Sequence, residues 1–160
     1  MLNRSCGVAT RPGGLIEEAL THSIIGAFFE VYHILGYGFL EHVYMLALER
    51  ELLARGHAVT RELGVSISYK GEALTSQRLD FVVDGRVVVE IKSTHDLSKA
   101  APRQLHNYLR ATELEVGLLL HFGPEPKFHR LVSLNAERPA REKVRRAEPA
   151  AQNQNSDSSN

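Results

Sequence analysis

The chain has 160 residues and 43% of them are hydrophobic, so it is long enough to form one domain with a sizeable core. Its 19 lysines and arginines balance 19 aspartates and glutamates, which excludes a positive field over the whole molecule and leaves nucleic-acid binding to a local patch. The single cysteine, Cys6, excludes an internal disulfide and fits a reducing compartment. Because no apolar run approaches the roughly 20 residues of a membrane span and no signal-peptide pattern is present, we expect a cytoplasmic protein with no membrane partner.

Two helices are predicted after a polar, flexible leader of residues 1–14. Apolar residues recur at the spacing of one helical face from Leu15 to Leu35, and the glycine-containing segment 36–38 ends this helix. A second apolar face predicts a helix from about Phe39 to Arg55, closed by Gly56.

The sequence then changes to the alternation of period two that is typical of strands. Val59–Tyr69 and Ala73–Phe81 read as strands joined by a turn at residues 70–72. A further hairpin follows, in which two runs of apolar residues, 81–83 and 87–89, flank Asp84-Gly85, a strong signal for a tight turn.

The last elements are a helix and two strands. The helix is predicted from about Lys99 to Thr112, with Pro102 in its first turn, where a missing N–H does least harm. Val116–Phe122 is a nearly continuous apolar run, as expected for a buried strand, and Phe128–Leu134 is a candidate edge strand. The order of elements predicts an α/β sandwich with a mixed sheet.

One domain is expected over residues 15–134, followed by a disordered tail over residues 135–160. The tail has few large apolar residues to bury, whereas ordering each residue costs roughly 1–2 kcal/mol. Its basic cluster Arg141–Arg146 is suited to weak, salt-sensitive contacts with polyanions.

Charged residues interrupt the central hairpin where a buried strand should carry none. Asp80 lies near the start of the first strand, and Glu90 and Lys92 lie two apart on the second, so the latter two share a face. Like charges about 4 Å apart repel by roughly 4 kcal/mol at an effective dielectric constant of 20. A bound divalent cation is the simplest compensation.

The register of this hairpin decides whether its carboxylates can form one site. A two-residue turn at Asp84-Gly85 would place Asp80 and Glu90 on opposite faces, because directly opposite residues share a face. A common site therefore requires a bulge, or a three-residue loop over residues 83–85 with Gly85 in the left-handed conformation. We predict one of these departures.

Three motifs resemble a known family. Gly38-Phe-Leu-Glu41-His-Val-Tyr44 resembles the motif of the GxxExxY proteins, and Asp80 with Glu90-Ile-Lys92 resembles the signature of the PD-(D/E)XK nucleases, to which that family is assigned. Gln104-Leu-His-Asn-Tyr108 is similar to the Gln-x-x-x-Tyr element of RecB-type nucleases. The leading proline is absent, since Leu79 precedes Asp80. Over residues 15–134 the resemblance implies a restriction-endonuclease-like core, a mixed sheet flanked by helices.

The resemblance also implies a metal site. Glu41, Asp80, Glu90 and the carbonyl oxygen of Ile91 are the expected ligands of Mg²⁺ or Mn²⁺. Mg²⁺ prefers octahedral oxygen coordination at about 2.0–2.1 Å. Lys92 would position or deprotonate the attacking water, or stabilise the developing oxyanion.

The predicted third helix would complete the site. Gln104 and Tyr108 lie four apart, so they share a face and could reach the edge of the site, with Gln104 in a catalytic role and Tyr108 in substrate binding. Lys99 and Arg103 could bind substrate phosphates, or form the solvated face of this helix.

Each of these residues also has an ordinary explanation. Asp80 could open a strand, and Glu90 with Lys92 could be an exposed alternation on an edge strand. Glu41 gains roughly 0.3–1 kcal/mol from the helix dipole in the first turn of a helix. Tyr44 is better explained as core than as catalytic. The eight histidines have irregular spacings that do not fit a zinc site.

Taken together, the sequence predicts a metal-dependent nuclease that hydrolyses phosphodiester bonds in DNA. The alternative is a non-catalytic module that keeps the nuclease fold and binds nucleic acid or protein. The presence of the full set Glu41, Asp80, Glu90, Lys92 and Gln104 favours the enzyme, whereas the neutral charge and small size favour the module. The sequence leaves open whether the chain forms a homodimer and whether cutting starts at ends.

Overall fold

A five-stranded sheet, with strands in the order β3-β4-β5-β6-β7, forms the centre of the computed structural model, which describes residues 10–11 and 14–137. The strands are β3 (Val59–Tyr69), β4 (Glu72–Val83), β5 (Val87–Lys92), β6 (Val116–Phe122) and β7 (Pro126–Val132). Strands β5 and β6 pair in parallel, whereas the other neighbours pair antiparallel. The predicted mixed sheet is therefore confirmed.

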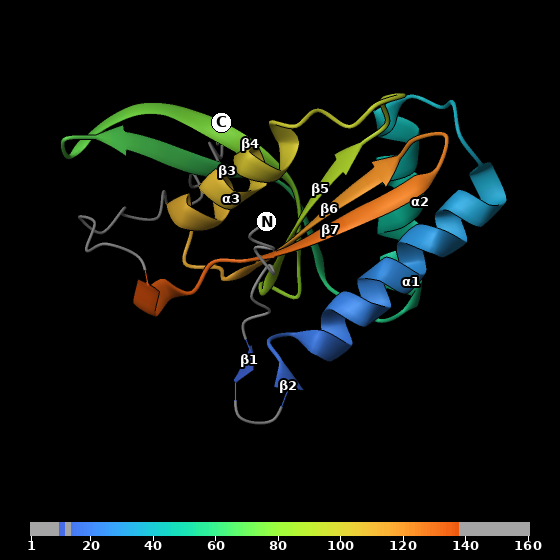
Figure 1. The fold of residues 1–160 in the computed structure, drawn as a ribbon, viewed down its shortest axis with the longest axis horizontal. Helices are drawn as coiled ribbons and strands as arrows, with labels where there is room; N and C mark the ends of the chain where they lie inside the picture. Colours follow the sequence, from blue (N-terminus) through green and yellow to red (C-terminus); the bar gives the residue numbers. More distant parts are fainter. Residues whose placement is uncertain (1–9, 12–13, 138–160) are drawn as a thin grey trace, which may run out of the picture.

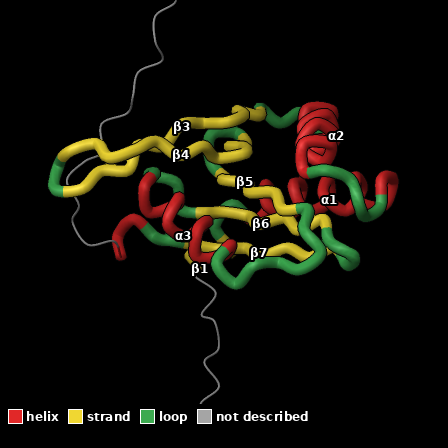
Figure 2. The backbone as a smooth tube through the Cα atoms, turned by 90° about the horizontal axis from the view of Figure 1, so that it is seen from above, coloured by secondary structure: helices red, strands yellow, loops and turns green. Residues whose placement is uncertain are grey.

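Helices cover both faces of this sheet (Figures 1 and 2). Helices α1 (Glu18–Leu35) and α2 (Glu41–Ala54) pack against one face, and α3 (Ala101–Ala111), in the connection between the parallel strands, packs against the other. Along β5 the side chains alternate, since Val87 and Val89 join the core under α1 and α2 while Val88 joins the core under α3.

The first helix begins three residues later than predicted. Glu17 has a φ of 53°, in the left-handed region, so a right-handed helix cannot extend back through it to Leu15. Ahead of it, β1 (Thr10–Arg11) pairs with β2 (Gly14–Leu15), so this part of the predicted leader has a paired backbone. At the other end a short 3₁₀ helix spans Asn135–Glu137.

The other predicted tail residues, with their basic cluster, and residues 1–9 of the leader lie outside the described residues. Within the described part of the chain, no helix has the length and apolar character needed to cross a bilayer.

The hairpin of β3 and β4 forms an arm that extends beyond the rest of the sheet (Figure 1). Its turn consists of Lys70 and Gly71, both with positive φ, and pairs Tyr69 with Glu72. The turn is thus one residue shorter than the predicted turn over residues 70–72. Most side chains near its tip are exposed.

The hairpin of β4 and β5 has one of the two predicted departures from a regular two-residue turn. Val83 pairs with Val87, so the loop has three residues, 84–86. Asp84 and Gly85 both have positive φ, 52° and 65°, and the N–H of Arg86 donates to the carbonyl of Val83 at 3.0 Å. The predicted length and the left-handed Gly85 are confirmed. The loop lies one residue further along than the expected 83–85, because Val83 still pairs in β4 and Arg86 belongs to the loop rather than to β5.

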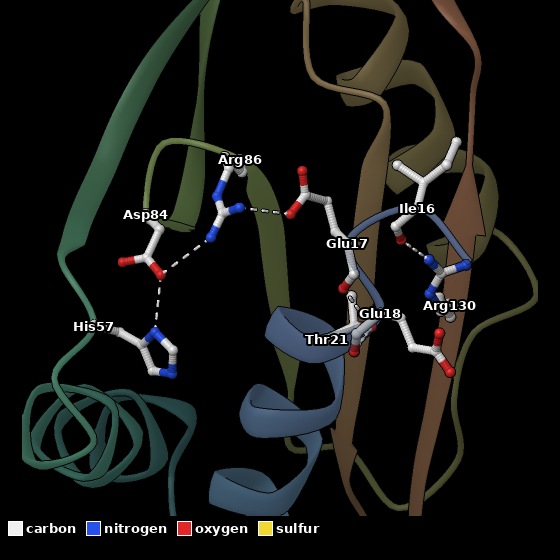
Figure 3. A network of polar contacts seen from close by, with 8 residues as sticks. All are labelled: Ile16, Glu17, Glu18, Thr21, His57, Asp84, Arg86 and Arg130. Atoms are coloured by element: carbon white, nitrogen blue, oxygen red, sulfur yellow. Dashed lines mark hydrogen bonds and ion pairs between the residues drawn. The ribbon is translucent and has the colours of Figure 1, made fainter. Parts of the chain in front are cut away.

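A network of polar contacts holds this loop (Figure 3). Asp84 accepts hydrogen bonds from the Nδ1 of His57 and from the backbone N–H of Ala58, both at 2.8 Å. Arg86 forms an ion pair of 3.0 Å with Glu17, just before α1. These contacts connect the loop to the start of β3 and to the segment before α1, which favours the three-residue loop over a two-residue turn.

Candidate active site

The register of the hairpin brings Asp80 and Glu90 to the same face of the sheet. Phe81 pairs with Val89, and continuing this register by one residue places Asp80 opposite Glu90. Because side chains alternate along β5, Glu90 and Lys92 project towards the α3 face, as Val88 does.

Hydrogen bonds and charges connect these residues. The Nζ of Lys92 donates to Oε1 of Glu90 at 2.8 Å, and the backbone N–H of Ile91 donates to Oδ2 of Asp80 at 2.7 Å. Glu41, the first residue of α2, lies close enough to the backbone of Ser93 and to the charges of Lys92 and Asp80 for each of them to shift its pKa. The predicted residues Glu41, Asp80, Glu90 and Lys92 thus come together where β5 ends.

Glu90 is the most perturbed group of this cluster. Its side chain is only 6% exposed. Burial first, and then the charge of Asp80, raise its pKa from 4.5 to about 7, although the hydrogen bond and the charge of Lys92 act in the opposite direction. Among the described residues, Oε2 of Glu90 has no hydrogen-bond partner although it is buried. An unpartnered buried carboxylate oxygen is costly, so a compensating ligand is expected at this position.

The pKa values of the neighbouring charged groups are also shifted. Burial raises the pKa of Asp80, while the N–H of Ile91 and the charge of Lys92 oppose the increase. Burial also raises the pKa of Glu41, with Lys92 opposing it and Asp80 adding to it. For Lys92, burial alone would lower the pKa, but the hydrogen bond and charge of Glu90 and the other carboxylates raise it. Lys92 therefore stays protonated in this cluster.

The donor set suits a hard divalent cation. Within the described residues, no three histidine, cysteine or acidic side chains are already drawn together as a metal-binding group. The chemistry of the cluster nevertheless fits Mg²⁺ or Mn²⁺, because the carboxylates of Asp80 and Glu90 repel each other and Oε2 of Glu90 is buried without a partner. A cation would relieve both conditions.

The structure places Gln104 and Tyr108 together on α3. The Nε2 of Gln104 donates to the hydroxyl oxygen of Tyr108 at 2.7 Å. Tyr108 is buried, and its pKa is raised by burial first and then by the charge of Glu90, so its hydroxyl lies within the field of the carboxylates. The predicted common face of Gln104 and Tyr108 is therefore confirmed.

The structure does not bring the two predicted phosphate-binding residues into this network. Lys99, two residues before α3, and Arg103, on α3, are both exposed. Neither forms an ion pair with a described residue. The side chain of Ile91 is buried in the core under α1 and α2, so only its backbone is available to the site, as its predicted role requires.

Sequence reasoning missed His121. This residue is the register partner of Lys92 on β6, is 3% exposed, and donates from Nε2 to the carbonyl of Thr94 at 2.7 Å. It thereby fixes the segment that leaves β5 directly after Lys92. The available signal was a single polar residue within the otherwise apolar run 116–122.

Tyr44 has a structural role beyond filling the core. Its ring is buried and stacks on Phe122 with centroids 4.2 Å apart, which confirms that it belongs to the core. Its hydroxyl donates to the carbonyl of Gly36 at 2.7 Å and accepts the N–H of Phe39 at 3.2 Å. Tyr44 therefore fixes the loop that leads into Glu41.

Comparison with known proteins places the chain in a family. The model for the PD-(D/E)XK nuclease superfamily matches residues 18–131. No curated protein matches the chain. The solved structure titled "Crystal structure of SSO0001" is similar, with 21% sequence identity and a TM-score of 0.48 over 74% of this chain, and the match covers 60% of that chain.

Superfamily members are typically nucleases and generally use divalent metals. The match spans most of the described residues and includes every element of the five-stranded sheet except the last residue of β7. The chain therefore belongs to the PD-(D/E)XK nuclease superfamily and has its α/β, restriction-endonuclease-like fold.

Proposed function

We propose that this protein is a metal-dependent nuclease that hydrolyses phosphodiester bonds in DNA. The observation that carries the proposal is Glu90, a buried carboxylate with a raised pKa and an unpartnered oxygen, on the same face as Asp80. Such an arrangement costs stability in the absence of a ligand, and perturbed carboxylates of this kind are concentrated at functional sites. The resemblance of the chain to the GxxExxY proteins, through Gly38, Glu41 and Tyr44, supports the fold and the site of a nuclease more firmly than its substrate.

The ligands of the metal would be the carboxylates of Glu41, Asp80 and Glu90 and the carbonyl oxygen of Ile91. When bound there, Mg²⁺ or Mn²⁺ would acidify a water molecule and neutralise negative charge on the phosphate. The hydrogen bond from the N–H of Ile91 fixes one oxygen of Asp80 against the backbone of β5, one residue after Glu90.

Lys92 supplies a positive charge beside the reacting phosphate. Because the surrounding carboxylates raise its pKa, its ammonium group would donate to a phosphate oxygen and stabilise the charge that develops there. This state does not suit a base, so of the roles considered for Lys92, positioning and charge stabilisation are favoured over deprotonation of water.

Residues of α3 would act at the edge of the site. The amide nitrogen of Gln104 is engaged by the hydroxyl of Tyr108, which leaves the amide oxygen to orient a water molecule. Lys99 and Arg103 are exposed and carry positive charge, so they would bind flanking phosphates of the substrate.

The test is cleavage of labelled single-stranded, duplex and branched DNA with Mg²⁺ or Mn²⁺. The wild type should cut at least one of them, and Glu90→Gln and Lys92→Ala should each lose about 100-fold or more in rate, the size expected for a lost charge-stabilising group. Glu30→Gln, which removes an exposed carboxylate of α1, is the matched control and should cut normally. Absence of cleavage by the wild type on every substrate, or full activity of Glu90→Gln, would contradict the proposal.

A further inference from the structure

Large apolar side chains are exposed in the connection between α1 and α2, immediately before Glu41. Tyr37 is 45% exposed, Phe39 48% and Leu40 80%. We call residues 36–40 the aromatic loop. Burying such side chains is normally favourable, so a concentration of them at one exposed loop indicates a surface that contacts another molecule.

The aromatic loop is held in one conformation. The hydroxyl of Tyr44 bonds the carbonyl of Gly36 and the N–H of Phe39, and the ring of Phe39 meets the ring of Tyr44 edge to face, with centroids 6.2 Å apart. Gly36 and Gly38 have positive φ, 69° and 112°, conformations that favour glycine. The exposed rings are therefore preorganised, so a ligand would pay little entropy to use them.

The aromatic loop also lies at the rim of the carboxylate cluster. The ring of Tyr37 contacts the ring of His95 edge to face, with centroids 6.4 Å apart, and His95 follows β5 by three residues. In Figure 1 the α1–α2 connection and the segment that leaves β5 meet at the same edge of the sheet. Glu41 follows the aromatic loop directly in the chain, as the first residue of α2.

We propose that the aromatic loop binds unpaired nucleobases of a single-stranded nucleic acid next to the phosphate that is cut. Aromatic rings stack on the flat faces of bases, and in a duplex neighbouring base pairs already cover those faces. The neutral net charge of the chain supports this occupant, because phosphate contacts alone would give weak binding and stacking adds affinity without charge. The proposal rests on the proposed function and adds to it the class of substrate.

Binding can be measured separately from cleavage. We would use a Glu90→Gln background with Mg²⁺ and follow the fluorescence anisotropy of a labelled single-stranded oligothymidine and of a labelled duplex. Tyr37→Ala and Phe39→Ala should each weaken binding of the single strand by about 5- to 150-fold, the size of one lost stacking contact. Phe39→Leu, which keeps apolar area but removes the ring, should weaken it nearly as much.

The matched control is Tyr69→Ala. Tyr69 is 60% exposed and ends β3 in the arm, on the other side of the molecule from the aromatic loop (Figure 1), so its loss should leave affinity unchanged. Thermal unfolding of each variant checks that the fold is intact. A single strand containing 2-aminopurine should also lose fluorescence on binding through stacking, and Tyr37→Ala should reduce this loss.

Three results would overturn the inference. The first is that the Glu90→Gln parent and its ring variants bind the single strand with equal affinity, and the second is that the duplex binds as tightly as the single strand. The third is that the loop mediates self-association, which would appear as a change in molecular mass on Phe39→Ala without a change in DNA affinity. If cleavage is lost in Glu90→Gln but Phe39→Ala leaves the affinity for the single strand unchanged, the inference is rejected and the proposed function stands. Ring-dependent binding without any cleavage by the wild type would reject the proposed function alone.

Discussion

Glutamine in place of Glu90 should stabilise the metal-free protein at alkaline pH. Burial and the charge of Asp80 raise the pKa of Glu90 from 4.5 to about 7 in the folded chain. Each pKa unit corresponds to about 1.4 kcal/mol, so ionisation of this carboxyl group costs roughly 3 kcal/mol of stability above pH 7. Glutamine avoids the charge and retains an oxygen that can accept the hydrogen bond from Lys92.

The sign of the pH dependence follows from the raised pKa. The folded protein holds this proton more tightly than the unfolded chain, so the contribution of Glu90 to the stability of the wild type falls as pH rises from about 4.5 to about 7 and then levels off. The advantage of Glu90→Gln should therefore be roughly 3 kcal/mol at pH 8, below about 1 kcal/mol at pH 5 and close to zero at pH 4.

Urea unfolding in the presence of EDTA, at pH 8 and at pH 5, measures this difference. Glu30→Gln, on the exposed surface of α1, controls for the general effect of a removed charge and should show no such dependence. If Glu90→Gln were no more stable than the wild type at pH 8, or had the same advantage in free energy of unfolding at both pH values, ionisation of Glu90 would not destabilise the folded protein as its raised pKa implies.

Three further substitutions test other parts of the structure. Tyr44→Phe removes both hydrogen bonds to the aromatic loop, so it should lower the free energy of unfolding in urea by about 0.5–1.5 kcal/mol and weaken binding of single-stranded DNA. Unchanged binding would show that the hydroxyl does not position the loop. Burial acts to raise the pKa of Asp84, but the hydrogen bonds from His57 and from the backbone N–H of Ala58 lower it, and the net shift is downward. Asp84→Asn should therefore be less stable than the wild type at pH 7, and this loss of stability should disappear as pH falls through the lowered pKa. A deficit of the same size at pH 7 and pH 3 would count against this assignment. Gly123→Ala would press a methyl group against the buried ring of His121 and should lower stability by about 1–3 kcal/mol, whereas wild-type stability would show that the ring moves freely.

Strand bounds follow from the sequence where local signals agree. The alternation of Val59–Tyr69 ends at the turn signal Lys70-Gly71, and the apolar run Val116–Phe122 ends at Gly123-Pro124, and the structure has strands with these bounds. The start of α1 could not be predicted, because the left-handed conformation of Glu17 depends on its surroundings, among them the ion pair with Arg86.

The candidate site could be predicted in part. Asp80, Glu90 and Lys92 stand out as charges within apolar strands, and the requirement that two of them share a face predicted either a bulge or a three-residue loop, of which the structure has the loop. Glu41 and Gln104 came from the family resemblance, because no local pattern relates a helix start to a strand about 50 residues later.

His121 and Tyr44 required the tertiary structure. The role of His121 depends on the parallel pairing of β6 with β5, which sets it beside Lys92, and the sequence does not specify which strands are neighbours. The role of Tyr44 depends on a backbone carbonyl at Gly36, which faces it only because of the turn between two helices. Such contacts follow from topology and backbone conformation rather than from periodicity.

The proposed function requires that Asp80 and Glu90 together hold a metal ion. Calorimetric titration of Mn²⁺ into the wild type, Asp80→Ala and the control Glu30→Gln tests this claim directly. The wild type and the control should bind Mn²⁺ saturably, and Asp80→Ala should not bind it. No binding by the wild type, or undiminished binding by Asp80→Ala, would contradict a metal site at Asp80 and Glu90 and would favour a non-catalytic module that keeps the nuclease fold.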